Sequence, residues 1–275
     1  MDRRAGPTLG PADEAGPNRR DLAGLAAGGL AAAGLAASGR AAAGREGSRP
    51  PPLRVAMLLF PGMTALDVVG PQNLLSGLAG PRIHLVAEHR GPVTSDTGLA
   101  IVATADFTSC PRDLHVLFVP GGDGTPGQMR NETLLAFLRD RAERAAWVTS
   151  VCTGSLILGA AGLLTGYRAT SHWCVRDSVL PLFGAIPVEA RVVFDRNRCT
   201  AAGVSAGLDF ALALAARLRD PDHARTSQLV AEYAPSPPFD AGTPHAAGPA
   251  ITRAANAILE DLARGSLAAA RARRD

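Results

Sequence analysis

Residues 147–161 of this 275-residue chain, WVTSVCTGSLILGAA, decide the fold. The segment 147–151 is typical of a buried strand, and an apolar segment typical of a helix follows Ser155. Small residues around Cys152 allow a tight strand-to-helix turn, as in the nucleophile elbow of hydrolases. At the start of a helix, free N–H groups and the helix dipole favour a thiolate. We therefore expect Cys152 to be a catalytic nucleophile.

Only one of the four cysteines has this setting; the other three are Cys110, Cys174 and Cys199. Most free cysteines in proteins are buried and inert. That is the alternative for Cys152 and the favoured interpretation of the others. The chain has no C-x-x-C pair, so the sequence predicts neither a zinc site nor a redox-active disulfide.

Strand-like and helix-like segments alternate along much of the chain. Short continuous apolar runs, which predict buried strands, occur at 54–60, 83–87, 116–119 and 147–151. Apolar residues at helical spacing occur at 64–78, 132–146 and 205–218. This order predicts an α/β fold with a mostly parallel sheet between layers of helices, and a hairpin-like excursion at 91–106.

In folds of this class, catalytic residues gather at the carboxyl ends of the strands. Asp67 follows the first strand, so we expect it in the first turn of the next helix, within reach of Cys152. Its carboxyl group can move a proton to or from substrate or water if burial raises its pKa. The alternative is an acidic residue that only stabilises a helix N-terminus.

Two further candidates come from glycine turns. Gly121 and Gly122 follow the third strand, and we expect their amides to line the site and face a developing negative charge. Such turns also occur for purely steric reasons. His172 follows a second glycine turn; a structural histidine bonded to a backbone group is the favoured interpretation, and a place beside the thiolate is the alternative.

The composition limits the class of protein. With 47% hydrophobic residues, the chain can form one sizeable core. The formal net charge is +3 and the arginines are spread along the sequence, so no nucleic-acid partner is predicted.

Residues 1–52 are rich in Gly, Ala, Pro and Arg and cannot bury enough apolar surface to fold, so we expect the folded domain to begin at residue 53. In this tail, Arg19 and Arg20 precede a mildly apolar run and the small residues 41–43. This order resembles a cleavable twin-arginine export signal, and the run is too short and Gly-rich for a membrane anchor. The alternative is a disordered tail on a cytoplasmic protein.

Four stretches resemble the PfpI-like superfamily, which has a flavodoxin-like or class I glutamine amidotransferase-like fold. They are SVCTGSLILGAAGLLTGYRATSHW (150–173), LLFPGMTALDVVGP (58–71), RVVFDRNRCTAAGVSAGLDFALALA (191–215) and QLVAEYAPSPPFDAGTP (228–244). The resemblance supports one catalytic domain over 53–250, followed by a C-terminal helix or tail over 251–275. Cys-Thr-Gly together with an aspartate in the first loop is the pattern of the isonitrile hydratase branch.

The resemblance implies a mechanism. A thiolate on Cys152 would attack the terminal carbon of an isonitrile and form a thioimidate, while Asp67 supplies a proton and later activates water to release an N-substituted formamide. Thr153 would assist through its amide or hydroxyl, and Gly121 and Gly122 would line the site. The resemblance implies a small-molecule substrate, a homodimer, and no metal or organic cofactor.

Two other functions remain open at this point. The same thiolate chemistry permits a glyoxalase-like or deglycase activity, although the Cys-His pair and glutamate of those branches are missing. A ligand or redox sensor related to AraC-type regulators is the non-enzymatic alternative. Only about one helix is expected over 251–274, which is too little for the paired helix-turn-helix of such regulators.

Overall fold

The computed structural model describes residues 52–77 and 80–273. The predicted tail and its export signal lie outside the described residues.

A seven-stranded sheet forms the centre of the domain. Its strands, in spatial order, are β10 (Val192–Asp195), β11 (Arg198–Ala201), β7 (Trp147–Ser150), β6 (Val116–Val119), β1 (Arg54–Leu58), β2 (Arg82–Ala87) and β5 (Ala105–Asp106). All neighbours pair in parallel except β10, which runs antiparallel to β11. The four predicted strands are confirmed as β1, β2, β6 and β7, although β2 is only partly buried.

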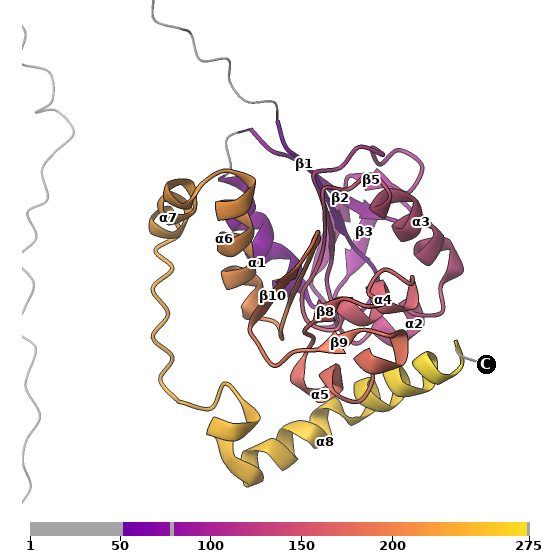
Figure 1. The fold of residues 1–275 in the computed structure, drawn as a ribbon, viewed down its shortest axis with the longest axis vertical. Helices are drawn as coiled ribbons and strands as arrows, with labels where there is room; N and C mark the ends of the chain where they lie inside the picture. Colours follow the sequence, from indigo (N-terminus) through magenta and orange to yellow (C-terminus); the bar gives the residue numbers. More distant parts are fainter. Residues whose placement is uncertain (1–51, 78–79, 274–275) are drawn as a thin grey trace, which may run out of the picture. The chain divides into compact units, whose positions relative to one another are not determined.

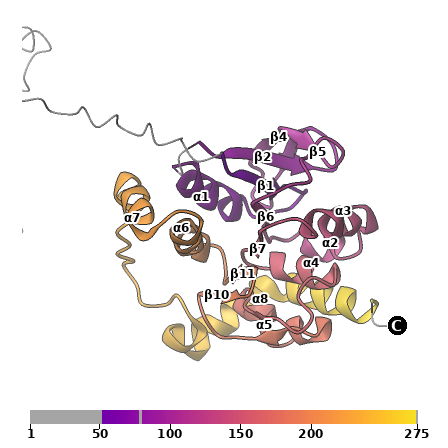
Figure 2. The same cartoon turned by 45° about the horizontal axis from the view of Figure 1, so that its top comes forward.

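Helices cover both faces of this sheet, which confirms the predicted fold class (Figures 1 and 2). On one face, α1 (Ala65–Ser76) packs beside α6 (Ala206–Leu218). On the other face lie α3 (Glu132–Ala142) and α4 (Gly154–Ala160). The expected helices at 64–78, 132–146 and 205–218 correspond to α1, α3 and α6.

Shorter elements connect these layers. The predicted excursion at 91–106 is an antiparallel hairpin of β3 (Gly91–Thr94) and β4 (Ala100–Ala103), after which β5 joins the main sheet beside β2. Beyond the sheet lie α2 (Thr125–Gln128), β8 (Arg168–Ala169), α5 (Trp173–Arg176), the 3-10 helix η1 (Leu180–Phe183) and β9 (Ile186–Pro187).

The C-terminal part of the chain leaves the sheet and ends in a long helix that packs on other helices of the domain. Helix α7 (Pro221–Val230) packs on α6, and the segment 231–243 leads from it to α8 (Pro244–Arg271) (Figure 1). Helix α8 has a kink at Gly248 and packs against α2 and α5. Among the described helices, none combines the length and the apolar character needed to cross a membrane.

The sheet topology positions the site. Strand β1 pairs with β2 on one side and with β6 on the other, so the chain reverses its direction of progress between β1 and β6. In open α/β sheets the crevice for ligands lies at the carboxyl ends of the strands at such a switch point. The segments that follow β1, β6 and β7 meet there, and they carry the predicted site residues except His172, which follows β8.

Candidate active site

Cys152 stands in the turn between β7 and α4, as predicted. Its backbone is left-handed, with φ of +56°, which is costly for a residue that is not glycine. Neighbouring backbone holds this conformation, because the Cys152 N–H donates to the carbonyl of Ala202 at 2.9 Å. The Cys152 carbonyl accepts hydrogen bonds from the hydroxyls of Ser155 and Ser171. The turn is therefore a strained nucleophile elbow fixed on both sides.

The elbow requires glycines around it. A methyl group on Gly121 would lie 2.5 Å from the Thr153 amide nitrogen and 2.9 Å from the Cys152 Cβ. A methyl group on Gly154 would lie 2.3 Å from the carbonyl oxygen of Val119. The loop after β6 thus packs directly against the turn after β7, and these two glycines make that approach sterically possible.

Asp67 lies in the first turn of α1 and is fully buried. Its Oδ2 accepts a hydrogen bond from the Gly121 N–H at 2.8 Å, and its Oδ1 has no hydrogen-bond partner among the described residues. Burial is the main cause that raises the pKa of Asp67 to about 7, and the negative charge of Asp96 adds to it. An acid–base role for Asp67 requires a raised pKa, and the structure meets this requirement.

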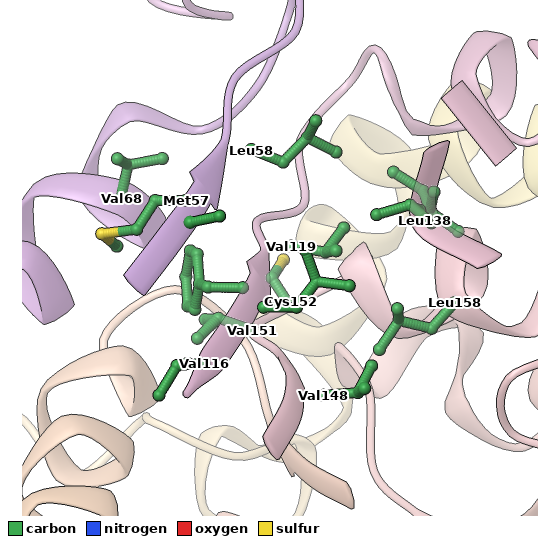
Figure 3. Packing of buried hydrophobic residues seen from close by; sticks show 14 of the residues in the cluster. Met57, Leu58, Val68, Val116, Val119, Leu138, Val148, Val151, Cys152 and Leu158 are labelled. Atoms are coloured by element: carbon green, nitrogen blue, oxygen red, sulfur yellow. The ribbon is translucent and has the colours of Figure 1, made fainter. Parts of the chain in front are cut away.

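The Cys152 side chain lies within the apolar cluster beside Val119 and Val151 (Figure 3). Burial, followed by the charge of Asp67, raises the pKa of the Cys152 thiol well above its ordinary value. Hydrogen bonds from the amides of Val204 and Thr153 act in the opposite direction. The expectation that the helix start alone favours a thiolate is thus incomplete, because burial opposes it. Asp67 and Cys152 are close enough to act as one pair that shares a proton.

Thr153 faces away from bulk solvent and is held by two partners. Its Oγ1 accepts from the Gly122 N–H at 3.0 Å and lies 2.7 Å from the Thr125 Oγ1. Both glycine amides after β6 therefore already have protein acceptors, Asp67 for Gly121 and Thr153 for Gly122. This differs from the expected oxyanion-stabilising role: the two amides position the side chains that flank Cys152.

His172 caps α5 and faces Cys174. Its Nδ1 accepts from the Cys174 N–H and lies 3.1 Å from the Cys174 sulfur. Burial lowers the pKa of His172, so the ring is neutral at pH 7. The structural interpretation of this histidine is the one that the geometry supports, although its neighbour Ser171 bonds to Cys152.

A pocket of about 450 Å³ adjoins the elbow. Three of the residues that line it, Ser171, Ala202 and Val204, also contact Cys152 through the bonds described above. The residues that line it also include Trp173, Arg176, Glu189, Arg191 and Pro244. Within residues 52–77 and 80–273, no group of three or more His, Cys, Asp or Glu side chains is arranged to hold a metal ion.

The model of the DJ-1/PfpI family matches residues 53–217 of the chain. The chain belongs to this family. A structure described as a THiJ/PfpI family protein from Pseudomonas syringae is 53% identical, with a TM-score of 0.78, and the match covers 80% of this chain and 91% of that one. The predicted family and fold are therefore confirmed.

Curated relatives of this DJ-1/PfpI protein include both enzymes and regulators. The isonitrile hydratase of Pseudomonas putida is 51% identical over 199 residues, which are 72% of this chain and 86% of that enzyme. The transcriptional regulator GbdR of Pseudomonas aeruginosa is 31% identical over 155 residues, which are only 42% of that regulator. The resemblance to the enzyme therefore extends over most of its length, and the resemblance to the regulator over less than half.

Sequence reasoning missed two contributors to this DJ-1/PfpI site. Val204 has a left-handed backbone, with φ of +29°, and directs its amide to the Cys152 sulfur. Thr125 supports Thr153 from α2. A signal existed for the first in the Gly203-Val204-Ser205 turn before a helix, but nothing in the sequence near Thr125 connects it to a residue 28 positions away.

Proposed function

We propose that this chain hydrates isonitriles to N-substituted formamides. The observation that carries the proposal is the 51% identity to the Pseudomonas putida isonitrile hydratase over 86% of that enzyme. The buried pair of Asp67 and Cys152 at the switch point of the sheet supplies a chemistry that fits this reaction.

The reaction begins with the proton that Asp67 and Cys152 share. The Asp67 carboxylate takes the thiol proton, the Cys152 sulfur forms a bond to the terminal carbon of the isonitrile, and Asp67 passes the proton to that carbon. The product is a thioimidate, R–N=CH–S–Cys152. The amides of Val204 and Thr153 stabilise the sulfur while it carries negative charge.

Hydrolysis completes the cycle. Asp67, again a carboxylate, accepts a proton from water while the water oxygen bonds to the thioimidate carbon, and it passes this proton to the nitrogen. The C–S bond then breaks, the remaining hydroxyl proton moves through Asp67 to the Cys152 sulfur, and R–NH–CHO leaves. One water is consumed for each isonitrile, and the enzyme returns to its starting state.

The test is turnover of an alkyl isonitrile by the full chain, with formamide measured by chromatography. Cys152→Ala is expected to abolish turnover, and the matched control Cys199→Ala, at a buried cysteine on β11, is expected to retain it. An intact chain that leaves the isonitrile unchanged would sink the proposal, and methylglyoxal consumption would then test the deglycase alternative.

A further inference from the structure

The pocket beside the elbow has an excess of hydrogen-bond donors. Arg176 and Arg191 line it together with one acidic residue, Glu189, whose side chain is 81% exposed. Ser171, Ala202 and Val204, which also line this pocket, bond to Cys152, and Val204 does so at the thiol. Cys152 itself does not line the pocket, so a group bound here lies one residue away from the reacting cysteine.

The guanidinium group of each arginine donates some of its hydrogen bonds to protein acceptors and has others left for a ligand. Arg176 donates from Nε and Nη2 to Asp177, and its side chain is only 13% exposed. Arg191 donates from Nε to Asp209 and from Nη2 to Ser205. Arg176 also interacts with Glu189, and Arg191 with Tyr233, so each guanidinium keeps only part of its donor capacity for a ligand. The carboxylates of Asp177 and Asp209 fix the two guanidinium groups but do not line the pocket.

His172 adds a third donor. Because its Nδ1 accepts from the Cys174 N–H, the proton of the neutral ring is on Nε2. His172 lines the pocket, and the described part of the chain provides no acceptor for Nε2. Two guanidinium groups and the His172 Nε2–H therefore line one pocket, and the fitting partner for such a set of donors is an anionic group with several acceptor atoms.

We infer that this pocket holds the nitrogen substituent of the substrate and selects isonitriles whose substituent carries a carboxylate. The inference rests on the proposed function and names its substrate class. The isonitrile carbon lies at Cys152, and the carboxylate accepts from Arg176, Arg191 and His172. Glu189, which lies 3.6 Å from Arg176 and is mostly exposed, swings into solvent when the carboxylate binds.

The test compares isocyanoacetate with its methyl ester, a pair that differs in charge at one end. The full chain is expected to show a higher kcat/KM for the carboxylate. Arg176→Gln is expected to lower the ratio of carboxylate to ester by about tenfold, the loss of one hydrogen bond to a charged group. Glu189→Gln, at an exposed side chain, is expected to raise the ratio. Arg225→Gln on α7, which changes the net charge equally outside the pocket, is the control.

A second measurement separates this inference from the proposed function. Iodoacetate and iodoacetamide alkylate the same thiol and differ in charge, and mass spectrometry of the peptide that contains Cys152 gives the ratio of their rates. Arg176→Gln is expected to lower this ratio and Glu189→Gln to raise it, whether or not isonitriles react. Ester turnover without any preference for the carboxylate would overturn the inference and leave the proposed function intact. Alkylation ratios equal in all variants would overturn the inference even if no isonitrile reacted.

Discussion

Asp67 and Cys152 are the residues on which the proposed chemistry depends. Each is buried, which raises the pKa of both. The charge of Asp67 makes ionisation of Cys152 more difficult still, whereas a hydrogen bond from Cys152 acts in the opposite direction on the Asp67 pKa. A buried pair of this kind holds a single proton over a wide pH range, and the proton is available to whichever reacting atom needs it. In the active form the pair holds one proton, with Asp67 as the carboxylate and Cys152 as the thiol. This form is lost when Asp67 also takes up a proton.

We therefore expect the activity to fall with decreasing pH. The pKa of Asp67 is about 7, so kcat/KM for an isonitrile should decrease from about pH 8 to about pH 5 as the carboxylate that accepts the thiol proton disappears. A pH–rate profile measures this directly. Asp67→Asn should lose roughly 10²-fold or more at every pH. Asp96→Asn should shift the midpoint to lower pH, because Asp96 raises the Asp67 pKa. A flat wild-type profile would contradict the role of Asp67.

Gly121 provides a steric test of the packing around Cys152. Gly121→Ala places a methyl group 2.5 Å from both the amide nitrogen and the Oγ1 of Thr153, so backbone must move. We expect a loss of about 2 kcal/mol or more in the free energy of unfolding, measured with urea, together with slower turnover. The control is Gly127→Ala, where a methyl group meets nothing within 4 Å. Equal effects of the two changes would show that close packing at Gly121 is unimportant.

Among the structural elements, the short helix α2 supports the elbow through one side chain. The Thr125 hydroxyl lies 2.7 Å from the Thr153 hydroxyl, and both are buried. Thr125→Val keeps the shape and removes the partner, so we expect it to cost about 1–3 kcal/mol and to slow alkylation of Cys152. Thr125→Ser should restore most of the alkylation rate. If the valine and serine variants alkylate at the same rate, the hydroxyl has no positioning role.

The helices and strands also show how much of the fold and of the site can be predicted from the sequence alone. The apolar runs at 116–119 and 147–151 predicted β6 and β7 because strands buried on both faces have no polar alternation. Cys152 and Asp67 could be placed at one crevice because each follows a strand of a parallel sheet. The family resemblance added the prediction of a reaction, which stays a proposal.

Other features of the site depend on tertiary contacts that leave no local pattern. The amides of Gly121 and Gly122 were expected to face substrate, but their acceptors are side chains from α1 and from the turn after β7. His172 faces Cys174 because it caps a short helix whose existence was not predicted. Such pairings become visible only when the loops are packed together.

At the scale of the whole molecule, the family resemblance implies a homodimer, which stays a prediction. Leu229, Val230 and Phe239, at the end of α7 and in the segment after it, are each about four-fifths exposed. Large exposed apolar groups of this kind favour association. Light scattering is expected to give twice the mass of one chain, and Phe239→Glu to weaken the dimer. Leu99→Glu, on the loop before β4, is the control. The mass of a single chain at all concentrations would contradict the prediction.

We also propose that Arg19 and Arg20 belong to an export signal. Replacing both with lysine is expected to prevent export of the full chain in a bacterial host, since a twin-arginine signal is read through that pair. Export is measured by fractionating the cells and detecting the protein in each fraction. The same distribution for the original chain and the double lysine variant would contradict the proposal.

The position of α8 has a consequence for the order in which the site is completed during synthesis. Helix α8 packs on α2, where Gly265 lies against Pro126, and Arg273 donates to the carbonyl of Met129. The rim of the pocket at 242–244 also comes from this end of the chain. Chains emerge from the ribosome with the N-terminal part first. A nascent chain thus carries Cys152 long before the residues that support and enclose it, and the site is complete only after α8 has been synthesised.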